Sequence, residues 1–287
     1  MAVEEYWAPA TLSDALERLR GGDVTILAGG TDLMPQSHAG RVTLARGLLN
    51  VRRVPELRGI EAADGGVRIG ALCTMSELMR DPLVREHFGI LAEACDHFAS
   101  DQLRNAATLG GNVCNASPAG DTLVPLLVLD AEAELASKPD GRVQFRRVPL
   151  SAFFSGPGRT ARAPDELLCA IRLPRPPAGF VGRFYKAGLR PALDISAISI
   201  GIGGVPGGRA LGQARVAYGA VAPVPMRARR TEQALEGAVL DAATVERVAA
   251  IARDEVRPID DVRASAWYRR ELVFNMTRRM LGDVAHA

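Results

Sequence analysis

The sequence has few of the residues on which metal sites and common catalytic sites depend. Its 287 residues include only four cysteines, and no two of them form a Cys-x-x-Cys pair. A zinc or iron–sulfur site within this chain is therefore not expected, and free thiols in a cytoplasmic protein are the simplest interpretation. The four histidines show neither metal-ligand nor catalytic-triad spacing, so we assign them no catalytic role.

Strong net charge and long apolar runs are also missing. The formal net charge is +2, which is too small to indicate a nucleic acid as the main partner. No stretch of about twenty apolar residues is present, so we expect no membrane span. Residues 1–5 do not resemble a signal peptide, which predicts a cytoplasmic location.

Hydrophobic residues make up 47% of the chain, enough for a sizeable core. The length predicts about two domains.

Two glycine-rich turns are the most informative feature that is present. The first, at 28–35, is Ala-Gly-Gly-Thr-Asp-Leu-Met-Pro and follows the apolar run Val24 to Leu27. The second, at 107–113, is Ala-Thr-Leu-Gly-Gly-Asn-Val, and Asn-Ala-Ser-Pro-Ala-Gly-Asp follows at 115–121. Neither has the lysine and spacing of a Walker loop or the glycine spacing of a Rossmann fold. Glycines nevertheless let consecutive N–H groups approach one phosphate. Two such turns suit a long ligand with a central diphosphate, such as a dinucleotide.

Periodicity and turn residues predict an α+β fold. Residues 11–14 lead into a capped helix that carries Ala15, Leu16 and Leu19 and ends at Gly21-Gly22, and Asp32 or Thr31 can cap a short helix after the first turn. The proline-rich segment 174–177 is the clearest domain boundary. Before it, we expect strands at 24–27, 48–51, 67–70, 132–137, 143–148 and 166–173, and helices at 75–79 and 84–99. The apolar segment 124–129 is either a helix or a tight core element. After it, we expect strands at 179–186, 195–205 and 213–222, followed by helices at 231–235, 242–256 and 264–281.

The two turns resemble signatures of one known family. The first is similar to the Ala-Gly-Gly-Thr-Asp-Leu signature, and the second to the Thr-(Ile/Leu)-Gly-Gly-Asn signature, of the FAD-binding subunit of molybdenum hydroxylases. This family includes xanthine dehydrogenase-like, carbon monoxide dehydrogenase-like and N-heterocycle dehydrogenase complexes. The resemblance covers nearly the whole chain and continues, in the family's order, through Leu123 to Ala131, Glu166 to Leu168, Pro174, Tyr185-Lys186 with Asp194 to Ser196, and Arg263 to Arg270.

The resemblance implies a fold and domain boundaries. Two N-terminal α/β subdomains, about 1–57 and 58–176, would enclose FAD in a PCMH-type FAD-binding domain. A C-terminal flavoprotein domain, 177–287, would consist of a three-stranded antiparallel sheet with helices. One branch of the family carries an extra iron–sulfur cluster on a cysteine-rich insertion. We expect no such cluster, because this chain lacks the insertion.

The resemblance also assigns an FAD site. Backbone N–H groups of the first turn would hold the FAD diphosphate, together with the N-terminal end of the helix that follows. The residues assigned there are Ile26, Leu27, Ala28, Gly29, Gly30, Thr31, Asp32 and Leu33. Thr108, Gly110, Gly111 and Asn112 would form a second wall, where Thr108 offers its hydroxyl. Asn112 is either a direct ligand or a turn residue in the left-handed conformation.

Four further residues complete the assigned site. Asp121 would pair with a ribose or ribitol hydroxyl of FAD, and it is also placed to cap the helix after it. Lys186, one of only two lysines, would stabilise the reduced flavin, or else extend from a strand end into solvent. Phe98 and Leu168 would pack on the cofactor or belong to the core. Asp194, which is not among the assigned residues, would lie near the flavin end or form a buried salt bridge.

The resemblance implies an electron-transfer subunit. A large subunit would hold molybdopterin, and a small subunit would hold a pair of [2Fe–2S] clusters. This chain would pass electrons from the nearer cluster through FAD to NAD, a quinone, O2 or another acceptor. We expect a dimer of such heterotrimers. The alternatives are a stand-alone FAD-dependent oxidoreductase, for which we find no persuasive proton donor, and a non-enzymatic scaffold, against which the intact glycines argue.

Overall fold

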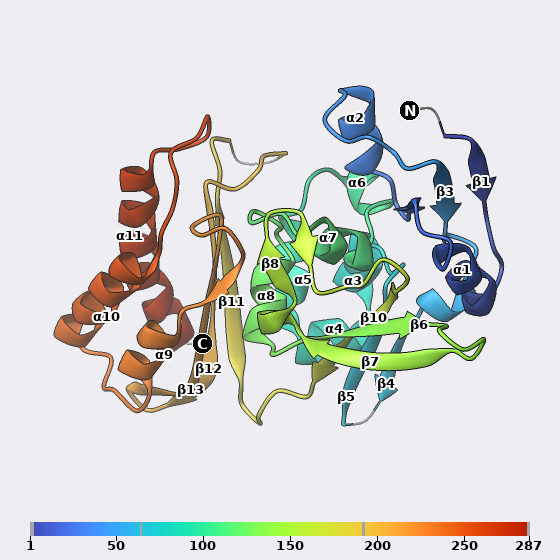
Figure 1. Ribbon diagram of the computed structural model, residues 1–287. Helices are drawn as coiled ribbons and strands as arrows, with labels where there is room; N and C mark the ends of the chain where they lie inside the picture. The colour runs from blue at the N-terminus through green and yellow to red at the C-terminus, as the bar shows by residue number, and fades with distance from the viewer. Residues whose placement is uncertain (1–2, 64, 191–192, 286–287) are drawn as a thin grey trace.

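In the computed structural model, which describes residues 3–63, 65–190 and 193–285, the chain begins with a small parallel sheet of order β1-β3-β2 (Figure 1). Helix α1 buries the apolar residues that its periodicity predicted, including Leu16 and Leu19. The Thr11 hydroxyl caps it by accepting a hydrogen bond from the Asp14 N–H at 3.1 Å. The elements are β1 (Glu5–Trp7), α1 (Leu12–Leu19), β2 (Val24–Leu27), α2 (Leu33–His38), β3 (Gly47–Asn50) and the 3-10 helix η1 (Pro55–Leu57).

A five-stranded antiparallel sheet, in the order β4-β5-β10-β6-β7, forms the centre of the next unit. Along β5, Val67 and Ile69 lie in the main core and Arg68 lies on the other face, the alternation that predicted this strand. The strands are β4 (Ile60–Ala63), β5 (Gly66–Gly70), β6 (Glu132–Ser137), β7 (Gln144–Pro149) and β10 (Leu167–Pro174), with the separate pair β8 (Phe154–Gly156) and β9 (Arg159–Thr160). The helices are α3 (Met75–Arg80), α4 (Pro82–His87), α5 (Gly89–Asp96), α6 (Asp101–Arg104), α7 (Leu109–Asn115) and α8 (Leu123–Val128), with the 3-10 helix η2 (Leu150–Ala152).

The C-terminal unit is an antiparallel sheet with helices on the face turned away from the rest of the chain (Figure 1). Its order is β11-β12-β13-β14. The first three strands were predicted, but the sheet has a fourth strand, so the expected three-stranded sheet is corrected to four. Strand β14 is two residues long and therefore shows no alternation in the sequence. The elements are β11 (Val181–Ala187), β12 (Ile198–Gly207), β13 (Ala210–Gly219), β14 (Met226–Arg227), α9 (Arg229–Leu235), α10 (Ala242–Glu255) and α11 (Ala266–Ala285). No helix in the described ranges has the length and apolar character needed to cross a membrane.

Helix α8 lies between the central unit and the C-terminal sheet (Figure 1). All of its residues are buried. Glycines on β12 and β13 leave room for this helix. A Cβ atom added to Gly201 would lie 2.9 Å from the Val124 side chain, and one added to Gly219 would lie 3.0 Å from it. The close approach of helix and sheet explains why glycine occupies these two buried strand positions.

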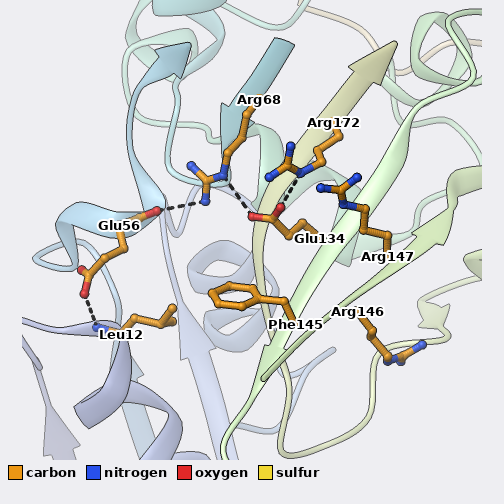
Figure 2. Close-up of a pocket in the computed structure, with 8 residues that line it drawn as sticks. All are labelled: Leu12, Glu56, Arg68, Glu134, Phe145, Arg146, Arg147 and Arg172. Atoms are coloured by element: carbon orange, nitrogen blue, oxygen red, sulfur yellow. Dashed lines mark hydrogen bonds and ion pairs between the residues drawn. The ribbon is translucent and has the colours of Figure 1, made fainter. Parts of the chain in front are cut away.

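The outer face of the five-stranded sheet carries a network of charges (Figure 2). Glu134 on β6 is 5% exposed and accepts hydrogen bonds from Arg68, at 3.0 Å, and from Arg172. Burial raises the pKa of Glu134, but the hydrogen bonds from the two arginines outweigh this effect and hold the pKa below its ordinary value. A cavity of about 530 Å³ lies over this network, between the start of α1 and strand β7.

Candidate functional site

The first glycine turn lies at the carboxyl end of β2 and packs on the segment just before the second glycine motif. A Cβ atom at Gly29 would lie 2.2 Å from the carbonyl oxygen of Ala106 and 3.2 Å from the Cα of Ala107. Only glycine permits this approach. The structure therefore brings together the two glycine segments that the sequence predicts to share a ligand.

The first turn presents a row of free backbone donors. Across the described parts of the chain, the N–H groups of residues 28–32 donate to no other group of the protein. Gly30 has a φ of +74°, and its carbonyl accepts a hydrogen bond from the Met34 N–H at 3.1 Å. The turn is thus closed on its carbonyl side, while its N–H groups are available to an anion.

The helix after the first turn is short, as predicted, but it lacks the predicted side-chain cap. Asp32 occupies the N-cap position of α2 but makes no capping hydrogen bond. Its carboxylate instead accepts a hydrogen bond from the Gln36 side chain at 2.6 Å. Because α2 has only six residues, few peptide dipoles add to the N-terminal charge that was expected there.

The second glycine segment is the first turn of helix α7 rather than an open loop. Thr108 caps the helix, and its hydroxyl accepts a hydrogen bond from the Gly111 N–H at 3.1 Å. The N–H groups of residues 109–112 all donate to oxygen atoms of the chain, at 2.8 to 3.1 Å. The expectation of a second backbone cradle is therefore wrong. A ligand on this side can use the hydroxyl hydrogen of Thr108 and the side chain of Asn112.

Asn112 links this segment to the residues that follow. It lies inside α7 without a positive φ, so a left-handed turn conformation, one of its two predicted roles, is wrong. Its Oδ1 accepts a hydrogen bond from the buried Thr122 hydroxyl at 2.7 Å. Thr122 is the N-cap residue of α8, so Asp121 does not cap that helix. Gly110 has a packing role, because a Cβ atom there would lie 2.6 Å from the Cβ of Ala71.

Asp121 and Lys186 form a buried ion pair between the central unit and strand β11. The Lys186 Nζ lies 2.7 Å from Asp121 Oδ2 and also donates to the carbonyl oxygen of His97 at 3.2 Å. Both side chains are 9% exposed. Burial raises the pKa of Asp121 to about 6, against the opposing effect of Lys186. Among the described residues, the second oxygen, Oδ1, is buried and has no hydrogen-bond partner, so it can accept a hydrogen bond from a ligand hydroxyl.

Phe98 and Leu168 lie in the core that backs this region. Phe98 packs half-buried against the main core, and Leu168 on β10 is 3% exposed within it. Their core role is present in the structure, and a cofactor contact stays a prediction. Within the described ranges, Asp194 has no salt-bridge partner, so the predicted buried salt bridge is wrong. Its half-buried carboxylate accepts hydrogen bonds from the Leu189 and Ile195 N–H groups and orders the loop after β11.

One connected region brings together the predicted residues of both glycine segments with Asp121 and Lys186. The contacts run from Gly29 to the residues preceding Thr108, and from Asn112 through Thr122 to the neighbour of Asp121. The sequence analysis named Ala107 only as part of the second turn, and it missed three contributors: Ala106, Thr122 and the carbonyl of His97. Two alanines beside a glycine motif are a signal for close packing that could have indicated Ala106. A backbone carbonyl has no such signal.

The cavity on the outer face of the sheet is a separate feature. None of the predicted cofactor residues line it, and Figure 2 shows the network around Glu134 among the residues that do. Among the described residues, no group of three or more His, Cys, Asp or Glu side chains could hold a metal ion. The four cysteines are free, as expected, and burial raises the pKa of Cys73 to about 11.

Comparison with known proteins decides the family. Residues 2–176 match the family described as FAD binding domain in molybdopterin dehydrogenase. Residues 183–284 match the CO dehydrogenase flavoprotein C-terminal domain. The chain belongs to the FAD-binding subunits of the molybdopterin dehydrogenases. The resemblance stated from the sequence is therefore confirmed.

Several relatives are similar along their whole length. The putative xanthine dehydrogenase FAD-binding subunit of Escherichia coli K12 is 34% identical over 285 residues, which cover 98% of this chain and 96% of that one. The carbon monoxide dehydrogenase medium chain of Hydrogenophaga pseudoflava is 31% identical over 280 residues, 96% and 95% of the two chains. A solved carbon monoxide dehydrogenase from that organism, lacking the Mo-pyranopterin moiety of its cofactor, matches with a TM-score of 0.93 at 29% identity, over 99% and 97%. This flavoprotein is thus an oxidoreductase subunit, and the α+β fold class is confirmed.

Proposed function

We propose that FAD binds to the connected region formed by the first turn, Asp121 and Lys186. The observation that carries this proposal is the buried, unpartnered Oδ1 of Asp121 beside a lysine. A diphosphate suits the free N–H groups of residues 28–32, and a sugar or ribitol hydroxyl suits Asp121 Oδ1. The other residues assigned to the same site are Ile26, Leu27, Leu33, Phe98, Thr108, Gly110, Gly111, Asn112 and Leu168.

The protein's part is to bind the cofactor, hold it in place and set the charge around it. When bound, FAD supplies one- and two-electron redox chemistry. The ammonium group of Lys186 favours a reduced, anionic flavin ring, and the carboxylate of Asp121 partly cancels that charge. The pair, rather than Lys186 alone, therefore sets the electrostatic balance at the site.

We infer that the chain is the electron-transfer subunit of a heterotrimeric molybdenum hydroxylase. It accepts electrons from a small [2Fe–2S] subunit and passes them to NAD, a quinone, O2 or another acceptor. A large molybdopterin subunit acts on the substrate. The full-length similarity to relatives named as FAD-binding subunit and medium chain supports this inference. Doubling of the heterotrimer, a cytoplasmic location and a domain division after residue 176 belong to the same proposal.

Purification of the tagged chain from its native host tests the proposal. We expect flavin absorption together with iron, molybdenum and two partner chains. A yellow, metal-free protein that is catalytically active alone would support the stand-alone flavoenzyme instead. A chain that stays colourless after incubation with FAD would contradict the assignment of the flavin site.

A further inference from the structure

Helix α8 is held at both of its ends by cations from opposite edges of the C-terminal sheet. Lys186 lies on the edge strand β11, and it contacts Asp121, two residues before the helix begins. Arg227 lies on the other edge strand, β14, and it contacts the residues at the end of the helix. The six residues of α8 span about 9 Å at the usual rise per residue, so the two ends are rigidly linked.

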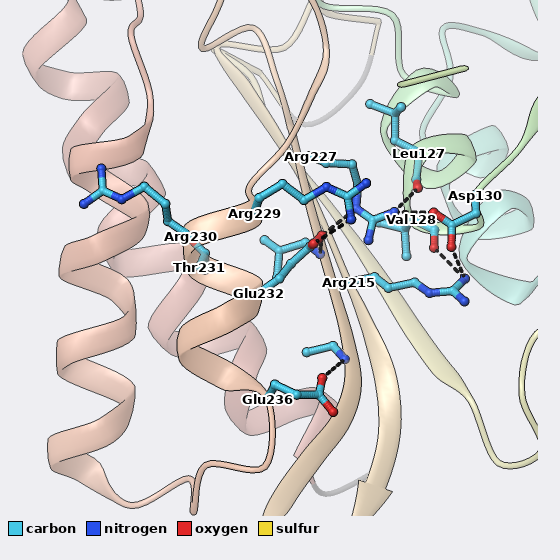
Figure 3. Close-up of polar contacts among 12 residues, drawn as sticks. Leu127, Val128, Asp130, Arg215, Arg227, Arg229, Arg230, Thr231, Glu232 and Glu236 are labelled. Atoms are coloured by element: carbon cyan, nitrogen blue, oxygen red, sulfur yellow. Dashed lines mark hydrogen bonds and ion pairs between the residues drawn. The ribbon is translucent and has the colours of Figure 1, made fainter. Parts of the chain in front are cut away.

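Arg227 connects the end of α8 to the C-terminal unit (Figure 3). Its Nη1 donates to the Leu127 carbonyl at 3.0 Å and to the carboxylate of Asp130, while its Nε donates to the buried Glu232. The Arg227 side chain is 6% exposed. Arg215 on β13 adds a hydrogen bond to the Val128 carbonyl at 3.1 Å. Guanidinium groups at the last carbonyls of a helix stabilise its C-terminal end.

The segment before the helix is also fixed to the sheet. The N–H of Ala220, just after β13, donates to the Pro118 carbonyl at 2.7 Å. In the middle, Gly201 and Gly219 allow the sheet to approach Val124 closely. Because packing is tight along this helix, a displacement at its last turn is transmitted to Asp121 at its start.

We propose that Arg227 is a positioning residue for the cofactor site. It fixes the end of α8 on the C-terminal sheet, which keeps Asp121 opposite Lys186 and its free oxygen directed to the ligand. The inference rests on the proposed binding of FAD at Asp121 and Lys186. Since coupling between sites is reciprocal, FAD bound at one end of α8 also stabilises the Arg227 contacts at the other.

Titration of the flavin-free, full-length chain with FAD tests this inference. We expect Arg227→Met to weaken FAD binding about tenfold, within the usual range of coupling between sites. Asp130→Asn should weaken it less, because Asp130 is one of three Arg227 partners. If Arg227→Met fails to fold, Asp130→Asn still tests the inference. Its own folding should not be impaired, because asparagine tolerates the φ of +52° at position 130. Arg229→Ala is the matched control: Arg229 pairs with the same Glu232, but its side chain is 60% exposed and, among the described residues, it has no hydrogen bond or ion pair with α8, so FAD affinity should not change.

Two further readouts separate positioning from a general loss of stability. We expect FAD to slow hydrogen exchange at residues 126–131 of the wild type and not of Arg227→Met. We also expect the effects of Arg227→Met and Lys186→Met on FAD affinity to be less than additive, because both act through Asp121. Unchanged FAD affinity in both Arg227→Met and Asp130→Asn would overturn the inference. The inference would also be overturned if the effects of Arg227→Met and Lys186→Met on FAD affinity were additive and Arg227→Met did not change the effect of FAD on hydrogen exchange at residues 126–131. A wild-type chain that does not bind FAD would instead contradict the proposed function.

Discussion

Gly29 packs on Ala106 so closely that a Cβ atom at Gly29 would lie 2.2 Å from the Ala106 carbonyl oxygen. This contact holds the first turn against the second glycine segment. Gly29→Ala forces the two backbones apart, so we expect a loss of about 1–3 kcal/mol in the free energy of unfolding. We also expect FAD to bind about tenfold more weakly, equal to ~1.4 kcal/mol of binding free energy. Urea unfolding and titration with FAD measure the two effects.

Gly89→Ala is the matched control for this substitution. Gly89 begins α5, its φ is not positive, and a Cβ atom there would meet nothing within 4 Å. We expect the free energy of unfolding to stay within about 0.5 kcal/mol of the wild-type value and FAD affinity to stay unchanged. Wild-type FAD affinity in Gly29→Ala would show that the contact between the turns is not needed for binding.

The sequence predicted the elements whose pattern is local, and it missed those that depend on distant partners. Alternation at Val67 to Ile69 and the prolines after β10 were sufficient signals. Strands β1 and β14 have two or three residues and exist because they pair with β3 and β13. Helix α7 was interpreted as a turn because its two glycines permit a close backbone approach to a phosphate, and glycine also has low helix propensity. Its close contact with Ala71, which requires glycine, was not visible in the sequence.

For the candidate site, too, the sequence identified residues but not the contacts between distant parts of the chain. The glycines of the first turn were identified from the sequence itself, and the two charged residues, Asp121 and Lys186, through the family resemblance. Their mutual contacts were not, because Lys186 and Asp121 are 65 positions apart and meet only once the C-terminal sheet packs on α8. The expected second cradle is absent mainly because of distant partners. The N–H groups of Leu109 and Gly110 donate to the carbonyl oxygens of Cys73 and Ala71, and those of Gly111 and Asn112 donate to Thr108, so free donors cannot be inferred from glycines alone.

Lys186→Met and Asp121→Asn should shift the flavin midpoint potential in opposite directions. The first leaves the Asp121 carboxylate without its cation and disfavours the anionic reduced flavin, so the potential falls. The second leaves the ammonium of Lys186 uncompensated, so the potential rises. We expect shifts of about 30 mV, which correspond to a tenfold change for a two-electron couple. Spectroelectrochemical titration of the FAD-loaded protein measures them.

The only other lysine provides the control for these potentials. Lys138 pairs with Glu17 at 3.0 Å and is not among the residues assigned to the cofactor. Lys138→Met should therefore leave the midpoint potential unchanged. Shifts of the same sign in Lys186→Met and Asp121→Asn would mean that the pair does not act on the flavin through its charge.

The raised pKa of Asp121 predicts a stability cost at neutral pH in the flavin-free chain. The carboxyl titrates near its ordinary value of 3.8 when unfolded and at about 6 when folded, because it is buried. Between these values the folded state binds more protons than the unfolded state, so stability falls as pH rises through the window. Relative to Asp121→Asn, the wild type should lose stability from about pH 4 to pH 7. Urea unfolding of both proteins across this range measures the difference, and parallel profiles would show that the folded carboxyl titrates normally.

Glu134→Gln should lower stability without changing FAD affinity. Glutamine keeps the shape of the side chain but removes the charge that Arg68 and Arg172 share on the outer face of the sheet (Figure 2). We expect a loss of about 1–3 kcal/mol in the free energy of unfolding at neutral pH. The folded pKa of Glu134 lies below its ordinary value of 4.5, so its contribution is present above that pH and disappears as the pH falls through the lowered value. The stability gap between wild type and variant should therefore close in acid, as measured by urea unfolding. Weaker FAD binding by Glu134→Gln would show that the charge network and the cofactor site are coupled, against their separate placement in the fold.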